Sequence, residues 1–459
     1  MSKAIRVGAG QGFYGDDPWF ALQSAKYGNV DYMGFDSLAE LTLAILEKAR
    51  QKNPDKGYAA DIITYANLLL PFVKERGLSL VTNAGGLNPN AAAKAVARLA
   101  KEIDFDNLKI ATITGDDIKG KIKQLRQSGL KFENLDTGEP MPEEILNNII
   151  FANCYLGALP VKDALDRNAD IVVAGRITDP ALFAGPILSG MNWQTDNLDQ
   201  VAFATLLGHL LECGGQITGG NFSGDWESIP NLERLGYPIA EVYDDLTAVI
   251  TKPEGTGGMV SVDTVKEQML YEIHDPSNYI GPDCVVDITS AILTDIGKNR
   301  VKIAGVRGKK PPAALKALFA YPDGYIAEGR ILYGVPNALR KAKAMAEIMK
   351  KRLDILGIKP IAYESEFIGG GALKRKEPDY EPDEILLRVA VKVNTKEEAQ
   401  QVTKLFPAYI LDGPPGADFF GAPPKPRQAI GIWSALIDRE LIERDVKVNV
   451  KTAKEILEA

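Results

Sequence analysis

Residues 78–89 read Leu-Ser-Leu-Val-Thr-Asn-Ala-Gly-Gly-Leu-Asn-Pro and contain the unit that decides the fold of the first half of the chain. The apolar run at 78–82 predicts a buried strand, and a loop of asparagine and glycine follows it. Asn88 suits the N-cap of a helix and Pro89 its first turn, which predicts a helix over residues 89–102. A strand, a polar loop and a helix in this order are typical of a parallel sheet covered by helices.

The same unit recurs through residues 1–230, which we interpret as an α/β domain. Further strands are predicted at residues 5–8, 30–35, 108–113, 149–153 and 170–174, and further helices at 37–51, 60–76 and 118–127. In an open α/β sheet, ligands bind outside the carboxyl ends of the strands. We therefore expect the glycine, asparagine and aspartate loops that follow these strands to meet in one site.

Residues 231–459 differ, because the predicted strands follow one another directly and long helices are fewer. Strands are predicted at residues 284–294, 301–308, 327–333, 363–367, 385–393 and 408–411, and helices at 260–272, 336–356 and 396–405. This pattern favours a second, α+β domain of mixed sheet and helices.

Composition narrows the class of protein. A chain of 459 residues is too long for one ordinary core, which favours two domains. The net charge of −8 argues against nucleic acid or an anionic membrane as the main partner. No apolar run approaches the roughly 18 residues of a membrane span. The three cysteines are widely spaced without a CxxC pair, and the first strand starts with no leader before it, so we expect a reducing, cytoplasmic location.

A glycine-rich connector follows a predicted helix at 202–211. It reads His209-Leu-Leu-Glu-Cys-Gly-Gly-Gln-Ile-Thr-Gly-Gly220. A thiol at such a turn is compatible with a nucleophile at Cys213, and His209 lies on the same helical face if the helix reaches that far. Both residues are equally compatible with simple packing. The predicted substrate contacts of the connector are Gln216, Thr218, Gly219 and Gly220.

Charged residues follow two other predicted strands. Asp116 and Asp117 suit a substrate ammonium, a metal or the start of a helix, and with only two histidines in the chain no metal is predicted. Arg176 is predicted to grip a carboxylate or phosphate, beside Asp179. The alternative for Arg176 is a structural ion pair with Asp116 or Asp117.

A glycine fingerprint, Gly10-Gln-Gly12-Phe-Tyr-Gly15, follows the first predicted strand, and Asp36 ends the second. This spacing is typical of a nicotinamide-binding fold. Asp16 and Asp17 come directly afterwards, however, where a pyrophosphate needs the positive end of a helix. A nicotinamide-dependent oxidoreductase is therefore only a minor alternative.

Three further loops offer candidate contacts. The backbone amides of the loop at 83–86 would hold an oxygen of the substrate, or else form an ordinary capped turn. The loop at 252–258 would cradle an anion and supply Glu254 as a base. The loop at 413–427 is long enough for a lid or an interface element. The predicted contacts in these loops are Asn83, Gly85, Gly86, Thr256, Gly257 and Arg427.

Five of these motifs, in order, resemble the acyclic terpene utilisation AtuA family over nearly the whole chain. They are the stretches at 8–16, 81–86, 114–117, 174–180 and 212–220. The resemblance implies an acyl-CoA or carboxylic-acid substrate from the breakdown of branched acyclic terpenoids. Some members of that family carry an added small C-terminal domain, which implies a small partner subunit here.

Together these patterns predict a hydratase, lyase or hydrolase without a redox cofactor, with its site between the two domains. Arg176 and the amides at 83–86 would hold a carboxylate or thioester oxygen. Asp116 or Glu254 would move the proton, and Cys213 would be nucleophile or polar wall. The alternative is a non-catalytic subunit that binds an acyl group or organises a complex. Homo-oligomers are compatible with either function.

Overall fold

The computed structural model describes residues 4–459 and divides the chain into two compact units. The first unit holds the residues up to 146, 150–319 and 433–459, and the second holds 147–149 and 320–432. The change of character predicted near residue 230 falls inside the first unit. The reason is that the strands after residue 230 extend the sheet of the preceding half instead of starting another one.

The first unit is built on one ten-stranded mixed sheet. In spatial order its strands are β11 (Ile292–Gly297), β12 (Arg300–Ala304), β8 (Ala248–Thr251), β7 (Ile239–Tyr243), β1 (Ala4–Gln11), β2 (Tyr32–Phe35), β3 (Ser79–Thr82), β6 (Ile171–Ala174), β4 (Lys109–Thr114) and β19 (Lys447–Thr452). The five strands from β1 to β4 in this order run parallel, and the strands on either side of them run antiparallel. The predicted α/β class is confirmed.

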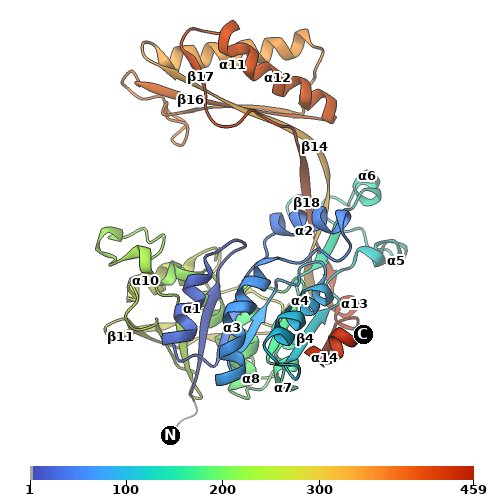
Figure 1. The fold of residues 1–459 in the computed structure, drawn as a ribbon, viewed down its shortest axis with the longest axis vertical. Helices are drawn as coiled ribbons and strands as arrows, with labels where there is room; N and C mark the ends of the chain where they lie inside the picture. Colours follow the sequence, from blue (N-terminus) through green and yellow to red (C-terminus); the bar gives the residue numbers. More distant parts are fainter. Residues whose placement is uncertain (1–3) are drawn as a thin grey trace. The chain divides into compact units, whose positions relative to one another are not determined.

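Helices cover both faces of this sheet (Figure 1). One face packs against α1 (Pro18–Tyr27), α3 (Asp61–Arg76), α4 (Pro89–Glu102) and α14 (Ala453–Glu458), and the other against α7 (Leu159–Asp166), α8 (Ala181–Gly190) and α9 (Leu198–Glu212). The alternation of a strand explains this double layer. In β2, Met33 and Phe35 join the first core, whereas a Cβ on Gly34 would lie 2.4 Å from the ring of Phe183 in α8.

Shorter elements complete the first unit. They are α2 (Glu40–Lys52), α5 (Ile122–Gln127), α6 (Glu143–Asn147), α10 (Val262–Leu270) and α13 (Arg439–Glu443), together with a small sheet of β13 (Arg307–Lys309), β10 (Val285–Asp287) and β9 (Tyr279–Ile280). The strand predicted at 149–153 forms as β5 (Phe151–Cys154), but it pairs with β14 and lies outside the parallel sheet. That prediction was wrong about its partner, because strand order is set by tertiary contacts.

The second unit pairs an antiparallel sheet with two helices. In spatial order its strands are β15 (Ala362–Ile368), β16 (Glu384–Val393), β14 (Ala314–Gly334) and β17 (Ala417–Phe419), and β18 (Arg427–Asp438) also pairs with β14. The helices are α11 (Ala338–Ile355) and α12 (Lys396–Asp412). Of β14 and β18, residues 320–334 and 427–432 belong to this unit. Its core lies between the sheet and the helices. The strand predicted at 408–411 is wrong, because α12 continues past Pro407 to Asp412.

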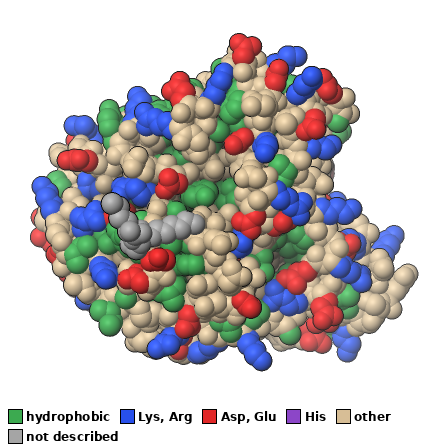
Figure 2. All heavy atoms as spheres, turned by 90° about the horizontal axis from the view of Figure 1, so that it is seen from below, with side chains coloured by type: hydrophobic (Ala, Val, Ile, Leu, Met, Phe, Trp, Pro, Cys, Tyr) green, Lys and Arg blue, Asp and Glu red, His purple; other side chains and the backbone are tan. Residues whose placement is uncertain are grey.

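Neither the described helices nor the surface drawn in Figure 2 presents one long apolar region. No helix within residues 4–459 combines the length and the apolar character needed to cross a bilayer. On the face drawn in Figure 2, acidic and basic side chains are interspersed, with hydrophobic side chains visible between them.

Candidate active site at the carboxyl edge of the parallel sheet

The loops after the parallel strands are joined by direct side-chain contacts at one edge of the sheet. After β3, the Asn83 amide donates to Oδ1 of Asp36, which follows β2, over 2.7 Å. The backbone N–H of Ser37 donates to Oδ1 of Asn83 over 2.7 Å, and the Ser37 hydroxyl donates to Gln11 at the end of β1. Asn83 is fully buried and therefore serves to hold Asp36 in place.

Arg176 follows β6 and is 3% exposed. Its Nη1 donates to the carbonyl of Leu38 and to Oδ1 of Asp179, each over 2.9 Å. Its guanidinium stacks 4.2 Å from the ring centroid of Tyr155, whose hydroxyl donates to Glu40. Burial opposes the charge of Arg176, but the negative charges around it, Asp179 first among them, together outweigh burial and the pKa of Arg176 is raised. The ion pair of this side chain is with Asp179, so the predicted alternative, a pair with Asp116 or Asp117, named the wrong partner.

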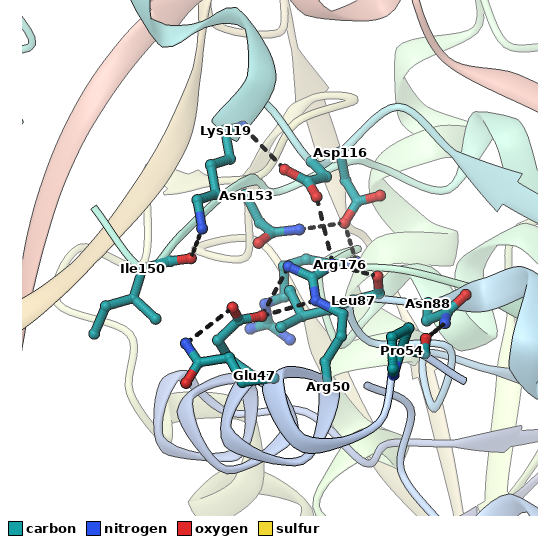
Figure 3. Close-up of polar contacts among 12 residues, drawn as sticks. Glu47, Arg50, Pro54, Leu87, Asn88, Asp116, Lys119, Ile150, Asn153 and Arg176 are labelled. Carbon is teal, nitrogen blue, oxygen red and sulfur yellow. Dashed lines mark hydrogen bonds and ion pairs between the residues drawn. The ribbon is translucent and has the colours of Figure 1, made fainter. Parts of the chain in front are cut away.

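Asp116, after β4, touches the backbone of Arg176 and not its guanidinium. Oδ2 of Asp116 accepts the backbone N–H of Arg176 over 2.7 Å and the side-chain amide of Asn153 over 2.8 Å (Figure 3). Burial raises the pKa of Asp116 to about 6, although both donors favour the ionised form. The neighbouring Asp117 accepts from the N–H of Lys119, and its Oδ2 lies 3.9 Å from Nη1 of Arg50.

The end of α9 brings a buried acid and a buried imidazole together. Nδ1 of His209 and Oε1 of Glu212 lie 3.0 Å apart, so one proton is shared between them. Nε2 of His209 and Oε2 of Glu212 are buried and meet no described polar atom. Burial lowers the pKa of His209 to about 4, and burial with the charge of Asp179 raises the pKa of Glu212 well above its usual range.

Cys213 caps α9 and is half-buried. Burial, with the charge of Glu212 beside it, raises the pKa of this thiol to about 12. The His209 imidazole is used by Glu212, so these residues do not form a Cys/His pair of the activated kind. At neutral pH Cys213 is a thiol and suits the wall of a site better than a nucleophile.

We call Asp36, Asp179, Arg176 and Glu212 the acid cluster. Burial, followed by the charge of Asp179, raises the pKa of Asp36 well above its usual range, while Arg176 opposes the rise. The charge of Asp179 likewise raises the pKa of Glu212, and the charge of Arg176 lowers it. Two buried carboxyl groups thus depend on a guanidinium that already pairs with Asp179, and their pKa values are raised. The cluster reaches solvent at Asp179, whose side chain is 34% exposed.

Comparison with known proteins identifies the family of this chain. The family described as acyclic terpene utilisation family protein AtuA matches residues 5–448. The chain belongs to the AtuA family. Searches of curated proteins and of solved structures found no match. The family confirms the resemblance drawn from the five sequence motifs and links this AtuA-family chain to acyclic terpene utilisation.

In this AtuA-family protein, the glycine fingerprint at 10–15 is occupied by the side chain of Asp16 and by the connector after α9. Oδ2 of Asp16 accepts the N–H of Gly12 over 2.9 Å, and the hydroxyl of Tyr237 donates to the same carboxylate. Gly12 also packs on the connector after α9, since a Cβ there would lie 2.8 Å from the backbone nitrogen of Gly214. A carboxylate and a second chain segment therefore lie where a pyrophosphate would need free amides.

The amides predicted to hold an oxygen are largely engaged. In the loop at 83–86, the N–H of Ala84 donates to Oγ1 of Thr82 and that of Gly86 to the carbonyl of Asn83. A Cβ on Gly85 would lie 2.4 Å from the carbonyl oxygen of Ala174, so this glycine serves close packing. The loop is the well-capped turn that the sequence left open as the alternative.

The polar groups of the connector after α9 are likewise engaged in hydrogen bonds within the protein. The hydroxyl of Thr218 contacts the carbonyl oxygens of Gly215 and Gly236 at 2.9 and 2.7 Å. The N–H groups of Gly219 and Gly220 donate to the carbonyls of Gln216 and Gly215. These residues therefore fix the path of the chain that carries Glu212 and Cys213.

The remaining candidates lie away from the acid cluster. Glu254 and Thr256 line a separate cleft between β8 and α10, together with Lys252. In that loop the N–H groups of Thr256, Gly257 and Gly258 donate to carbonyl oxygens, so they form no anion cradle. Arg427 belongs to the second unit and pairs with Glu328 at 3.7 Å.

Sequence reasoning missed the groups that complete the edge. Asn153 lies in β5 and Tyr155 follows it, Glu212 is the last residue of α9 and was predicted only as part of the connector, and Tyr279 comes from β9 with its ring 5.3 Å from that of His209. The polar Asn153 inside the apolar run at 149–154 was the available signal. Among residues 4–459, no group of three or more His, Cys, Asp or Glu side chains is arranged to hold a metal ion.

Proposed function

We propose that this AtuA-family protein is an enzyme of acyclic terpenoid breakdown that acts by acid–base chemistry on an acyl-CoA or a small carboxylic acid. The reaction classes that fit are hydration, elimination and hydrolysis, and none of them needs a redox cofactor. Each requires a group that gives a proton and a group that takes one. The acid cluster supplies the candidates for both roles.

One observation supports this proposal above the others. Asp36 and Glu212 are 9% and 6% exposed, yet Arg176 is the one guanidinium that acts on both of them. A structural ion pair would match one carboxylate to one cation, whereas here the carboxyl groups outnumber the cation. Carboxyl groups with raised pKa values, held near a solvent-exposed third acid, are typical of general acids and bases.

The supporting residues have distinct roles in this proposal. Asn83 orients Asp36 through its amide, and His209 orients Glu212. Nε of Arg176 is buried and meets no described polar atom, so its N–H is left to hold a carboxylate or thioester oxygen of the substrate. Cys213 forms part of the wall as a neutral thiol.

The cavity next to the acid cluster is too small for a substrate, which supports a second candidate function. It measures about 40 Å³, is lined by Thr178, Pro180 and Tyr279 among others, and holds little more than water. A substrate would have to enter from the solvent side at Asp179. A subunit that binds or presents an acyl group without converting it is therefore the second candidate.

The test is turnover of a defined panel. Purified protein is incubated with saturated, 2,3-unsaturated and 3-hydroxy branched acyl-CoA thioesters and with the matching free acids, and the products are followed by mass spectrometry. We expect gain or loss of water, or release of CoA, from one member of the panel. Asp36→Asn and Glu212→Gln should abolish this conversion, while the exposed Asp263→Asn on α10 should leave it unchanged.

Three results would go against the proposal. Conversion that survives both Asp36→Asn and Glu212→Gln would remove the acid cluster from the chemistry. Binding of a panel member, seen as a thermal shift that Arg176→Lys weakens, without any conversion would favour the acyl-binding subunit. Conversion only in the presence of a nicotinamide would restore the oxidoreductase alternative.

A further inference from the structure

A second, larger cavity lies in the first unit, outside the acid cluster. It measures about 1000 Å³ and is lined by residues of β1, β7, β8 and β12, by the loop at 228–231 and by the segment at 251–261. None of the four residues of the acid cluster lines it. This volume is at the upper end of the range for small-molecule sites. We call it the Lys252 cleft.

Lys252 is a buried cation in this cleft without a matching carboxylate. Its residue is 8% exposed, and its Nζ donates to the carbonyl of Thr256 over 2.7 Å and to the Thr256 hydroxyl over 3.2 Å. No carboxylate oxygen of residues 4–459 lies within 4.0 Å of this ammonium. A buried charge with only neutral partners is costly unless a counter-charge joins it.

A second lysine adds to the same positive charge. Lys298 lines the cleft from the turn between β11 and β12, and its ammonium also has no carboxylate within 4.0 Å among the described residues. Burial lowers the pKa of Lys252, and the nearby charge of Lys298 lowers it further. Like charges gathered on one cleft are typical of a site for an anion.

Of the other charged residues of the cleft, two arginines share one carboxylate, and the exposed Glu254 forms no ion pair among the described residues. Arg300 pairs with Glu241 at 2.6 Å, and Arg6 pairs with the same carboxylate. Asp295 accepts the N–H of Gly297 over 2.9 Å and so belongs to the turn. Four cations and three carboxylates thus line the cleft, and Lys252 and Lys298 are the two cations that pair with no described carboxylate.

We propose that the Lys252 cleft binds a ligand through a phosphoryl group held by Lys252 and Lys298. Two ammonium groups match the double charge of a phosphoryl group better than the single charge of a carboxylate, and lysine is a common point-charge partner of phosphate. The source is either the diphosphate of a nucleotide such as CoA or free phosphate. This proposal does not depend on the acid cluster being catalytic.

Isothermal titration calorimetry on the full chain tests the cleft directly. The ligands are pyrophosphate, CoA and, as a carboxylate control, succinate. We expect pyrophosphate or CoA to bind at low salt, more tightly than succinate, and more weakly as salt rises. Tighter binding of CoA than of pyrophosphate identifies a nucleotide as the source, and equal binding identifies the phosphate alone.

Variants assign the binding to this cleft. Lys298→Ala removes an exposed side chain that forms no ion pair, so the protein should fold normally and bind the phosphate ligand about tenfold more weakly. Lys252→Met should weaken it further, and Lys252→Arg should restore most of the loss. The matched control is Lys266→Ala, on the exposed side of α10 and outside the cleft lining.

The proposal is overturned by any of three results. Neither phosphate ligand binds the folded wild-type protein, or succinate binds as tightly as pyrophosphate, or Lys298→Ala binds phosphate ligands as well as wild type. Each of these outcomes leaves the test of the acid cluster unaffected, because that test measures conversion and uses different variants.

Discussion

Two buried carboxylates in the first unit have opposite pKa shifts. Asp116, at the carboxyl edge of the sheet, is 3% exposed and accepts only neutral N–H groups, and burial raises its pKa to about 6. Glu241, in the Lys252 cleft, is 8% exposed. Burial alone would raise its pKa too, but the ion pairs with Arg300 and Arg6 outweigh it, and its pKa is lowered.

The difference shows what burial does with and without a matching cation. At the carboxyl edge, the buried carboxyl groups outnumber the cations beside them, so burial raises their pKa values. In the cleft, cations exceed the carboxylates that pair with them, so the region attracts an anion. The carboxyl edge is therefore the region for which we propose proton transfer, and the Lys252 cleft is the region for which we propose anion binding.

The largest expected effect concerns the acid cluster. If Asp36 and Glu212 exchange protons with the substrate, Asp36→Asn or Glu212→Gln should lower turnover roughly 10²–10⁴-fold, the usual contribution of a general acid or base. Steady-state kinetics on the converted panel member measures this effect. Losses of similar size from Glu241→Gln would contradict the division between the two regions.

The second prediction concerns stability and Asp116. Its folded-state pKa of about 6 exceeds the ordinary value of 3.8, so its contribution to stability is fully present below about pH 4 and is lost as pH rises through 6. Asp116→Asn keeps an oxygen for both donors and removes the charge. The free energy of unfolding of this variant should therefore exceed that of wild type by about 2–3 kcal/mol at pH 7 and equal it near pH 3.5.

Urea denaturation at both pH values measures this difference. A variant that is less stable than wild type at pH 7 would show that the Asp116 charge is matched and not merely buried.

Glu241 should behave in the opposite way. Its lowered pKa stabilises the folded state above the unfolded pKa, and this stability is lost as pH falls through the folded pKa. Glu241→Gln leaves Arg6 and Arg300 without their carboxylate and should destabilise the protein by about 1–2 kcal/mol at pH 7, because solvent screens the partly exposed Arg300. The same urea experiment should show the deficit shrinking toward pH 3.

The smallest expected effect is at Cys213. With a pKa near 12, this thiol has almost no thiolate at pH 7.5, so iodoacetamide should label it slowly and faster only as pH rises. Peptide mass spectrometry follows the labelling. Cys213→Ala should change turnover less than about twofold, whereas loss of turnover with rapid labelling at pH 7 would restore the nucleophile.

The sequence predicted the edge better than the contacts on it. Patterns of apolar runs and capping residues placed the loops after β2, β3, β4 and β6, because these signals are local. They did not show that β6 lies between β3 and β4, and this order brings Arg176 to Asp116. The pairing of Asn83 with Asp36 also depends on tertiary contact, as does the burial of Glu212 at the end of α9.

The central claim is that burial and the charge of Asp179 raise the pKa values of Asp36 and Glu212 in the acid cluster. A pH titration of ¹³C-carboxyl-labelled Asp and Glu side chains by NMR, on wild type, Asp36→Asn and Glu212→Gln, tests it without any substrate. The account predicts that each variant loses a carboxyl resonance whose midpoint lies well above the ordinary value for that side chain. It is contradicted if the resonances lost in both variants titrate at the ordinary values.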